Sequence, residues 1–371
     1  MRIAITGAQG FIGRNLQVRL KELGHLDPVL IPHDVKPEAL PALLAGVDFV
    51  FHLAGVNRPL DPSDFTQGNH VFTRILCEAM AGLPTKPRIA YASSTQAALD
   101  NPYGRSKREA EDELLAYGEK TGTSVHVFRL TNVFGKWSRP NYNSAVATFC
   151  HNIARGEQIT VKDPDAPLRL IYIDDVLRHF CALLDDPAAP SGLLQAGPEY
   201  DTTVGALADQ IRAFQSSRES MVTERVGTGL TRALYATYVS FLPLPAFEYE
   251  VQRHADPRGV FVEMLKTPDC GQFGYFTAFP GITRGEHYHH TKTEKFLVIK
   301  GTASFGYRHI LTNETYEIIT RGGDGRIVET IPGWTHNVSN IGDDELVVMV
   351  WANEIFDRQK PDTIAQKVQQ A

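Results

Sequence analysis

The pattern of apolar and polar positions divides the chain into a first part that mixes strands with helices and a second part made of strands. Residues 2–6 form a short apolar run, and Phe11, Leu16, Leu20 and Leu23 then follow at helical spacing. Further apolar runs of strand length lie at residues 28–35, 47–57 and 88–93. Strands that alternate with helices predict an α/β fold with a doubly wound parallel sheet.

Alternation with a period of two marks the C-terminal part of the chain. Successive side chains of a strand point to opposite faces, so within residues 281–301 His287 and His289 share one face, and Tyr288 and His290 share the other. A short polar turn follows, and we expect the next apolar run to return antiparallel to the first.

Residues 241–247 contain two prolines and no periodicity, which is typical of a linker. We therefore expect an α/β domain over residues 1–243 and an all-β domain over residues 244–371. The length of 371 residues agrees, because it exceeds what one ordinary core supports.

The composition is that of a soluble globular protein, with 43% hydrophobic and 22% charged residues. No apolar run reaches the length of a membrane span, and the N-terminal run is too short for a signal peptide, so we expect a cytoplasmic protein without a membrane partner. A net charge of −6 without a basic cluster argues against nucleic-acid binding. The 4 cysteines include no C-x2-C pair, and we expect reduced thiols.

Glycines punctuate the turn between the first strand and the first helix. Gly7, Gly10 and Gly13 form a G-x2-G-x2-G pattern that would present backbone N–H groups and the positive end of a helix to a pyrophosphate. Asp34 and Lys36 follow the second predicted strand, where an acid favours a free ribose 2′-hydroxyl and a base favours a 2′-phosphate. With one of each, these residues do not decide between NADH and NADPH.

Tyr103 and Lys107 stand four residues apart at the start of a predicted helix that runs to about Tyr117. At this spacing they lie on one face, and the ammonium is expected to lower the pKa of the phenol so that Tyr103 can act as an acid. Ser93 or Ser94, at the end of the preceding strand, could bind the oxygen that is protonated. A lone Tyr-x3-Lys pair is more often a pair of surface residues on a helix. Because this pair follows the glycine turn along the chain, we favour a catalytic role.

Three histidines and a glutamate are candidate metal ligands. His287, His289 and Glu294 are closely spaced, and His336 follows about forty residues later. Three imidazoles and a carboxylate suit a borderline divalent ion, and zinc is the first expectation.

The first part of the chain resembles the extended short-chain dehydrogenase/reductase family over roughly residues 1–240. The matching motifs are T-G-A-x-G-F-I-G at Thr6–Gly13, H-L-A-G at His52–Gly55, S-S at Ser93–Ser94, Y-G-x-S-K at Tyr103–Lys107, R-L-T-N-V-F-G at Arg129–Gly135 and Y-I-D-D-V at Tyr172–Val176. The resemblance implies a Rossmann-type sheet, a nicotinamide dinucleotide and a nucleotide-sugar substrate. Members that also remove water carry acidic residues where Thr95 and Gln96 stand, which argues against dehydration.

Carried over position by position, this resemblance implies a catalytic triad of Ser94, Tyr103 and Lys107. It implies cofactor contacts from the glycine turn, the loop after the third strand and the catalytic pair, namely Gly7, Gly10, Phe11, Ile12, Gly13, Leu53, Ala54, Gly55, Tyr103 and Lys107. It places Asn132 in the nucleotide-sugar pocket, and Asn141 and Arg169 are further candidates for contact with the nucleotide.

The set His287, His289, Glu294 and His336 resembles the metal-binding motifs of the cupin family, which implies an all-β barrel. The same segment resembles the cupin-type sugar 3,5-epimerases, in which the matched His287 would be a base and the matched Lys295 would hold an enolate. One imidazole does not readily serve as both ligand and base. Metal binding comes first here, because those epimerases lack the second histidine and the glutamate.

Almost end to end, the chain resembles the two-domain capsule and O-antigen enzymes of UDP-N-acetyl-L-fucosamine synthesis, in NPYGRSK, FGKWSRPNYNS and PGITRGEHYHHTKTEKFLVI. This resemblance implies epimerisation at carbon 3 of a UDP-2-acetamido-2,6-dideoxy-4-ketohexose in the cupin domain. NADPH-dependent reduction at carbon 4 would follow and give UDP-2-acetamido-2,6-dideoxy-L-talose. We also expect a homodimer.

Two alternatives stay open. In the first, the cupin domain is a non-catalytic sugar-binding or dimerisation module, and only the reductase acts. In the second, the protein is an epimerase with bound NAD and a metal-stabilised appendage. Deuterium incorporation at carbon 3 without NADPH would exclude the first alternative, in which the cupin domain is not catalytic. Net consumption of NADPH would exclude the second, in which the NAD stays bound.

Overall fold

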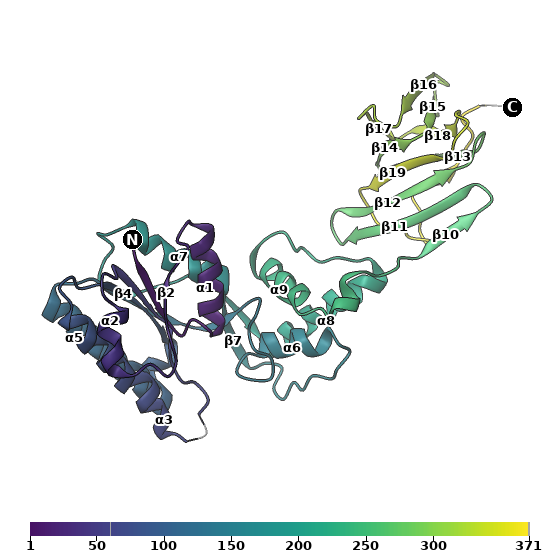
Figure 1. The fold of residues 1–371 in the computed structure, drawn as a ribbon. Coiled ribbons are helices and arrows are strands. Elements are labelled where there is room, and N and C mark those ends of the chain that lie inside the picture. Colours follow the sequence, from purple (N-terminus) through teal and green to yellow (C-terminus); the bar gives the residue numbers. More distant parts are fainter. Residues whose placement is uncertain (60, 370–371) are drawn as a thin grey trace. The chain divides into compact units, whose positions relative to one another are not determined.

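The computed structural model describes residues 1–59 and 61–369, and the chain forms two compact units (Figure 1). The first unit comprises residues 1–211 and 232–242, and the second comprises residues 212–231 and the chain from residue 243 onward. The chain therefore passes between the units three times. The expected division into domains at residue 243 stays a prediction about independent folding.

A six-stranded parallel sheet forms the centre of the first unit. Its order is β2-β1-β3-β4-β5-β8, with β1 Ile3–Thr6, β2 Val29–Ile31, β3 Phe49–His52, β4 Arg88–Ser94, β5 Val125–Leu130 and β8 Gly192–Leu194. The order reverses at β1, which is the arrangement of a doubly wound Rossmann-type sheet, as predicted. A separate sheet, β6-β7-β9, contains β6 Asn132–Phe134, β7 Pro167–Tyr172 and β9 Glu199–Thr203.

Helices cover both faces of the central sheet, with α1 packed beside α7 on one face and α4 beside α5 on the other (Figure 1). The helices are α1 Phe11–Glu22, α2 Leu40–Leu43, α3 Ser63–Phe65, α4 Phe72–Gly82, α5 Pro102–Thr121, α6 Ala145–Ile153, α7 Ile173–Asp185, α8 Val204–Ser220 and α9 Gly229–Ser240. Short turns of other helix types are η1 Pro37–Ala39, η2 Thr66–Val71, η3 Thr95–Ala98 and η4 Leu244–Phe247. Leu76, Met80, Ile89 and Leu114 bury one core between the sheet and α4 and α5.

Local signals explain why α5 begins and ends where it does. The Asn101 side chain caps the helix by accepting a hydrogen bond from Gly104 N at 2.8 Å, and Pro102 occupies the first turn, where its missing N–H costs nothing. Gly122 ends the helix in the left-handed region at φ 70°. The helix therefore extends one turn beyond the predicted end at Tyr117.

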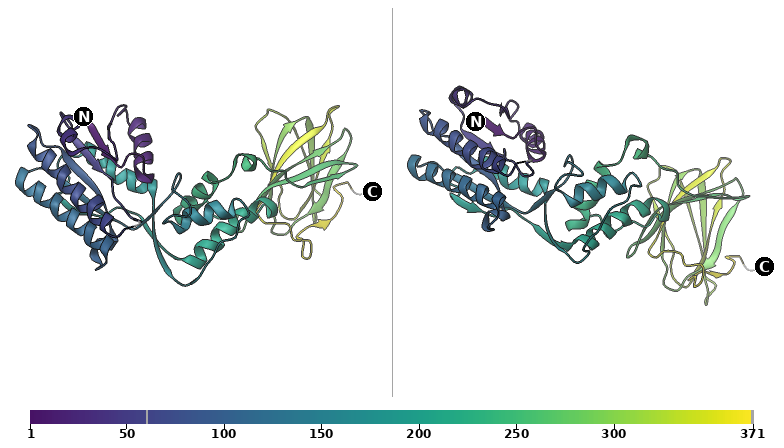
Figure 2. Two further views of the ribbon diagram at one scale, coloured as in Figure 1. Left: turned by 60° about the horizontal axis from the view of Figure 1, so that its bottom comes forward. Right: turned by 90° about the horizontal axis from the view of Figure 1, so that it is seen from below.

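The second unit contains two antiparallel sheets, which Figure 2 shows facing one another, in agreement with the predicted all-β fold. The first sheet has the order β10-β11-β12-β19-β14-β17, with β10 Arg253–Asp256, β11 Gly259–Thr267, β12 Gly271–Ala278, β14 Glu294–Lys300, β17 Ile327–Glu329 and β19 Leu346–Ala352. The second has the order β16-β15-β18-β13-β20, with β13 Thr283–Tyr288, β15 Thr302–His309, β16 Thr315–Arg321, β18 Trp334–Asn340 and β20 Ile364–Ala365.

Aromatic side chains fill the space between these two sheets. The ring of Phe296 lies 6.3 Å from that of Phe276 in its own sheet and 5.6 Å from that of Phe305 in the facing sheet. Val338 and Val348 belong to the same buried cluster. The two sheets therefore share one core.

The predicted hairpin between residues 283–288 and 294–300 is wrong. β13 pairs with β18 and β20, whereas β14 pairs with β17 and β19 in the other sheet. The apolar face of β14, with Phe296 and Val298, is buried in the interior that the two sheets share. The short connection between them crosses from one sheet to the other, so it brings side chains of both sheets together. Among the described helices of the whole chain, none is long and apolar enough to cross a membrane.

Candidate functional site

The glycine turn after β1 is shaped by close backbone contacts. A Cβ on Gly7 (φ 68°) would lie 2.6 Å from Ala54 N, and a Cβ on Gly13 would lie 2.3 Å from Gly7 O, so neither position accepts a side chain. Gly10 is the N-cap of α1 and provides no side-chain cap, and the first turn, which begins with Phe11, contains no acidic residue. A helix start without its own cap or acid fits the pyrophosphate of a dinucleotide.

The loop after β3 brings the predicted cofactor residues to the predicted catalytic lysine. The N–H groups of Leu53 and Ala54 each donate to Thr6 Oγ1 at 3.1 Å. A Cβ on Gly55 would lie 3.6 Å from the ammonium nitrogen of Lys107. The structure therefore places this loop and helix α5 side by side at the carboxyl ends of the parallel strands, where ligands of such sheets bind.

The side chains of Ser94 and Tyr103 lie beside each other in the structure. Burial raises the pKa of Tyr103, while the Ser94 hydroxyl acts to lower it. The expectation that Lys107 lowers the pKa of the phenol is not met, because the Lys107 ammonium donates to Ala92 O at 2.8 Å. Ser94 and Tyr103 alone form the contact through which a substrate oxygen could be protonated.

Lys107 is a buried cation. Its ammonium lies 4.3 Å from the centre of the Tyr91 ring, and burial lowers its pKa to about 7, while Glu111 acts to raise it. An ammonium with this pKa gains or loses its proton near neutral pH. It therefore fits a group that takes part in proton transfer.

The structure distinguishes Ser93 from Ser94. The Ser93 hydroxyl donates to the buried carboxylate of Glu111, which also accepts from Arg129 Nη2 at 2.7 Å. Ser93 is thus committed to a structural network, and Ser94 is the hydroxyl that meets Tyr103.

Asn69 is a polar residue beside this site that sequence reasoning missed. It lies in the π-helical turn η2, accepts from Val56 N at 2.8 Å and donates to Ser106 Oγ at 2.9 Å. Its amide thus connects the loop after β3 to α5, next to Tyr103. An asparagine within a helical pattern gives no signal of such a contact, which spans 37 residues of sequence.

The three predicted substrate residues lie on β6, β7 and the loop after β6. Asn132 donates to Arg169 O at 2.9 Å, so these two are neighbours. The Arg169 guanidinium is exposed and bound to Asp201 at 2.8 Å. Asn141 has a φ of 53° in an exposed loop. Of the three, only Asn132 and Arg169 are brought together.

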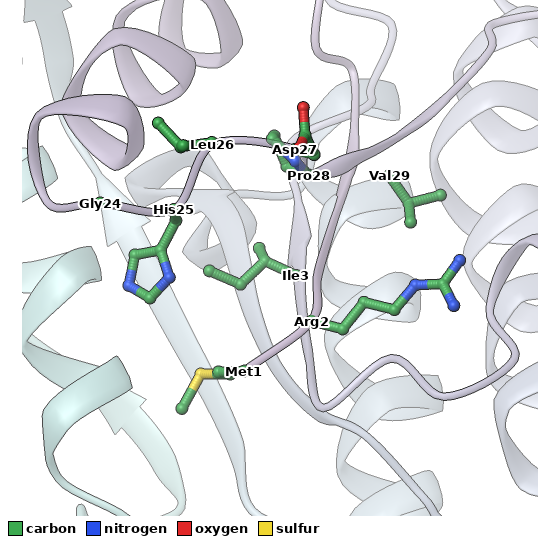
Figure 3. A pocket seen from close by; sticks show the side chains of 9 residues that line it. All are labelled: Met1, Arg2, Ile3, Gly24, His25, Leu26, Asp27, Pro28 and Val29. Atoms are coloured by element: carbon green, nitrogen blue, oxygen red, sulfur yellow. The ribbon is translucent and has the colours of Figure 1, made fainter.

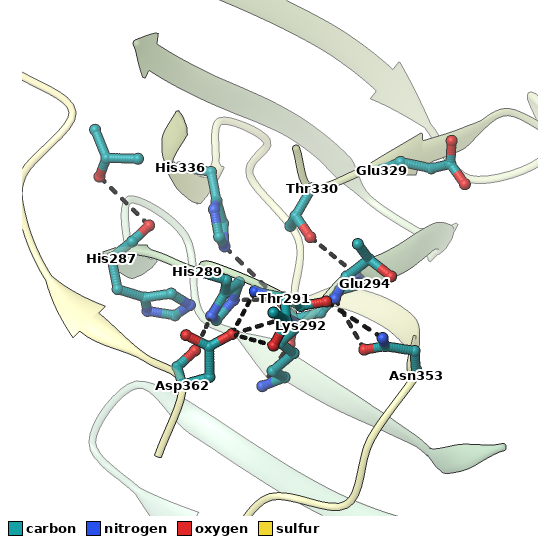
Figure 4. A network of polar contacts seen from close by, with 12 residues as sticks. His287, His289, Thr291, Lys292, Glu294, Glu329, Thr330, His336, Asn353 and Asp362 are labelled. Atoms are coloured by element: carbon teal, nitrogen blue, oxygen red, sulfur yellow. Dashed lines mark hydrogen bonds and ion pairs between the residues drawn. The ribbon is translucent and has the colours of Figure 1, made fainter. Parts of the chain in front are cut away.

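In the second unit, the four predicted metal ligands form one cluster (Figure 4). One ligand atom from each of His287, His289, Glu294 and His336 lies within 4.8 Å of the others. His287 and His336 pair across β13 and β18, His289 follows β13, and Glu294 begins β14 in the facing sheet. The cluster therefore depends on the crossing connection between the sheets.

The protonation pattern of the cluster fits a cation. His289 Nδ1 bonds to the carbonyl oxygen of Asp362; a carbonyl only accepts, so Nδ1 carries the proton, and Nε2 is the ring nitrogen that faces the cluster. That Nε2 lies 3.3 Å from Glu294 Oε2, which is also an acceptor. Within the described chain, neither ring nitrogen of the buried His336 has a hydrogen-bond partner. A divalent ion between these residues would bind Nε2 of His289, one ring nitrogen of His336 and the Glu294 carboxylate.

Burial and neighbouring charges favour the metal-binding protonation states of His287 and Glu294. Burial, and then the neighbouring His336 and His289, lowers the pKa of His287 to about 4. Burial acts to raise the pKa of Glu294, but the neighbouring His289 and His336 and the charge of Lys292 hold it well below its usual value. Neutral imidazoles and an ionised carboxylate are the forms that bind a metal.

The lysine beside the cluster is Lys292, and the predicted enolate partner Lys295 does not join it. Lys295 Nζ is half exposed and bound to Glu329 at 2.6 Å. Lys292 is buried, and its ammonium lies 3.1 Å from Glu294 Oε1.

A surface hollow at the other end of the central sheet is not part of either site. Figure 3 shows it lined by Met1–Ile3 and Gly24–Val29. These residues lie at the amino ends of β1 and β2, away from the glycine turn at the carboxyl end of β1. The hollow contains none of the side chains with candidate chemistry.

Residues 3–194 match the NAD dependent epimerase/dehydratase family, which covers more than half of the chain. The chain belongs to this family. Residues 254–364 match the polysaccharide biosynthesis C-terminal domain, so the second unit has family relatives of its own.

Relatives exist over the whole length of the chain. It is 55% identical over 365 residues to UDP-2-acetamido-2,6-beta-L-arabino-hexul-4-ose reductase of Pseudomonas aeruginosa, covering 98% of both chains. The crystal structure of the capsular polysaccharide assembling protein CapF from Staphylococcus aureus has a TM-score of 0.91 at 39% identity, with 99% of this chain and 100% of that chain covered. The chain is therefore a member of the two-domain group that these proteins represent.

More distant structures share the fold of the first unit. The UDP-glucuronic acid 4-epimerase from Bacillus cereus, solved in complex with NAD, has a TM-score of 0.54 at 19% identity and covers 65% of this chain and 98% of that chain. At this identity the likeness concerns the fold alone.

Proposed function

We propose that the protein is a nucleotide-sugar 4-ketoreductase that acts on a UDP-2-acetamido-2,6-dideoxy-4-ketohexose. The observation that carries the proposal is the contact between Ser94 and Tyr103 beside the buried Lys107, at the strand ends where the glycine turn also lies. The 55% identity to a reductase whose name contains such a ketosugar supports this substrate class.

Each residue of the site has a separate role in the reduction. Ser94 donates a hydrogen bond to the carbonyl oxygen at carbon 4, and Tyr103 delivers a proton to that oxygen as the carbonyl becomes an alcohol. Lys107, one helical turn from Tyr103 and with a pKa of about 7, returns a proton to the phenolate. Gly7, Gly10 and Gly13 would hold the pyrophosphate of NADPH, which supplies the hydride for carbon 4 when bound.

We further propose that the second unit epimerises carbon 3 of the same ketosugar before reduction. A carbon next to a ketone can lose its proton to a side-chain base and regain one on its opposite face when the enolate oxygen is stabilised by positive charge. His287, His289, Glu294 and His336 would hold a divalent ion, zinc first, which supplies such charge. The buried ammonium of Lys292 adds a second positive charge beside Glu294.

Tyr103→Phe tests the reductase. Removal of the proton donor should lower the rate of NADPH oxidation with the ketosugar by about 10²–10⁴-fold. Absorbance of NADPH at saturating ketosugar measures this rate.

Tyr117→Phe is the matched control, because Tyr117 lies on the same helix and its hydroxyl donates only to Pro87 O at 3.0 Å. This variant should keep the wild-type rate within a few-fold. An unchanged rate in Tyr103→Phe would remove Tyr103 from the mechanism. A NADPH balance of zero in the wild type would favour the bound-NAD epimerase alternative.

A further inference from the structure

The C-terminal strap, defined as residues 361–368, lies against the strand that carries His287. In this strap β20 pairs with β13, with Ala365 opposite His287 and Ile364 opposite Tyr288. A side chain also holds the strap, because Val368 N donates a hydrogen bond to the carboxylate of Glu286 at 2.7 Å.

Arg308 fixes the end of the same strap. This buried guanidinium donates from Nε to Val368 O at 2.9 Å and from Nη2 to Lys367 O at 2.6 Å. An arginine buried for this purpose indicates that the position of the strap is specified by the fold.

Within the strap, the Asp362 carboxylate binds the turn that crosses between the two sheets. It accepts hydrogen bonds from the N–H groups of His290, Thr291 and Lys292 at 3.0, 2.7 and 2.8 Å, and from Thr291 Oγ1 at 3.1 Å. Figure 4 shows Asp362 against this turn. These three residues lie between the cluster ligands His289 and Glu294, so the Asp362 carboxylate helps to fix the distance between the two ligands.

The backbone carbonyl of the same residue binds His289 Nδ1. A hydrogen bond at Nδ1 sets the tautomer and the orientation of the ring, and it leaves Nε2 to face Glu294. Asp362 thus touches the cluster in two ways, through its side chain at the turn and through its main chain at a ligand.

We propose that Asp362 is a positioning residue through which the C-terminal strap organises the metal cluster of the second unit. The inference rests on the proposed metal site. The strap lies about seventy residues beyond His287 in the sequence, and its binding to β13 would raise the affinity of the cluster for metal. Loss of partners of this kind lowers metal affinity by about 10–100-fold.

The test uses the full chain and three single variants. Asp362→Ala removes the side-chain contacts with the turn, and Asp362→Asn keeps an acceptor oxygen. Asp357→Ala is the matched control, because Asp357 lies just before the strap and its carboxylate accepts from Gln359 N at 2.8 Å within a local turn. Affinity for Zn²⁺ is measured by competition with a chromophoric chelator, and the visible spectrum of bound Co²⁺ reports the ligand geometry.

We expect Asp362→Ala to bind Zn²⁺ about 10–100-fold more weakly and to shift the Co²⁺ spectrum. Asp362→Asn should recover part of the affinity, and Asp357→Ala should match the wild type. Amide hydrogen exchange of metal-free protein gives a second readout. Residues 290–292 should lose protection in Asp362→Ala and keep it in Asp357→Ala.

Two failures are distinguishable. Wild-type affinity in Asp362→Ala would overturn the role of Asp362 and leave the metal site standing, whether or not the turn amides exchange faster. Wild-type protein that binds no Zn²⁺ would overturn the metal site and the inference together.

Discussion

His52 is a buried imidazole held between two hydroxyls. Its Nδ1 lies 2.7 Å from Thr6 Oγ1 and its Nε2 lies 2.8 Å from Thr73 Oγ1. Burial, and then the charge of Lys107, lowers its pKa from 6.5 to about 3. The neutral ring therefore helps to hold the loop that precedes Ala54 in the candidate cofactor site.

This shift predicts a pH dependence of stability. Between about pH 3 and 6.5 the unfolded chain binds a proton at His52 that the folded chain does not, so stability is complete above this window and falls as the pH is lowered through it. The contribution is at most about 1.4 kcal/mol per pH unit. Urea unfolding of the first unit at pH 7 and pH 5 should show a smaller loss for His52→Gln than for the wild type. The exposed His33→Gln is the control, and an equal loss in wild type and His52→Gln would contradict the assignment.

At the scale of elements, Glu111 joins α5 to two strands of the central sheet. It is buried, accepts from Arg129 of β5 and binds Ser93 of β4. Ser93 precedes Ser94, so this network also fixes the strand end that meets Tyr103.

Glu111→Gln should destabilise the first unit by about 2–3 kcal/mol, because it removes the charge from a buried hydrogen-bonded pair. Glu109→Gln on the same helix is the control. Glu109 is about half exposed and lies 3.3 Å from His70, so its loss should change the free energy of unfolding by less than about 1 kcal/mol. Equal urea midpoints for the two variants would show that the buried network contributes nothing.

Elements with local signals could be predicted from the sequence, and contacts between distant elements could not. The glycine turn and α5 follow from glycine spacing, a proline start and helical periodicity, all within about twenty residues. The sheet to which β14 belongs depends on pairing with β19, some fifty residues away, and the predicted hairpin was therefore wrong.

The same distinction applies to the site. Alternation indicated that His287 and His289 share a face, and their rings lie 4.9 Å apart. Lys292 and Asp362 were missed. Their roles depend on how a crossing turn meets a chain end 70 residues later, which no local pattern encodes.

At the scale of the whole molecule, residues 212–231 belong to the second unit although they precede part of the first. Met221 O accepts from Lys266 N at 2.7 Å, Thr223 N donates to Lys266 O at 2.8 Å, and Arg225 pairs with Asp269 at 2.9 Å. The second unit is therefore larger than the predicted domain of residues 244–371.

A fragment of residues 212–371 should melt at least about 5 °C higher than a fragment of residues 244–371, because the longer fragment keeps these contacts and the burial of Met221. A fragment of residues 232–371 controls for added length, and it should behave like the shorter one. Differential scanning calorimetry gives the three melting temperatures. Equal values for all three would show that residues 212–231 do not stabilise the second unit.

The central claim is that two separate sites act in order on one ketosugar. Its most direct test is mass spectrometry of UDP-2-acetamido-2,6-dideoxy-4-ketohexose incubated in deuterated water without NADPH. The wild type and Tyr103→Phe should both introduce deuterium at carbon 3, and His336→Ala should introduce little, because only the second site exchanges that proton. Absence of deuterium in the wild type, or equal deuterium in His336→Ala, would contradict the account and leave the second unit as a binding module.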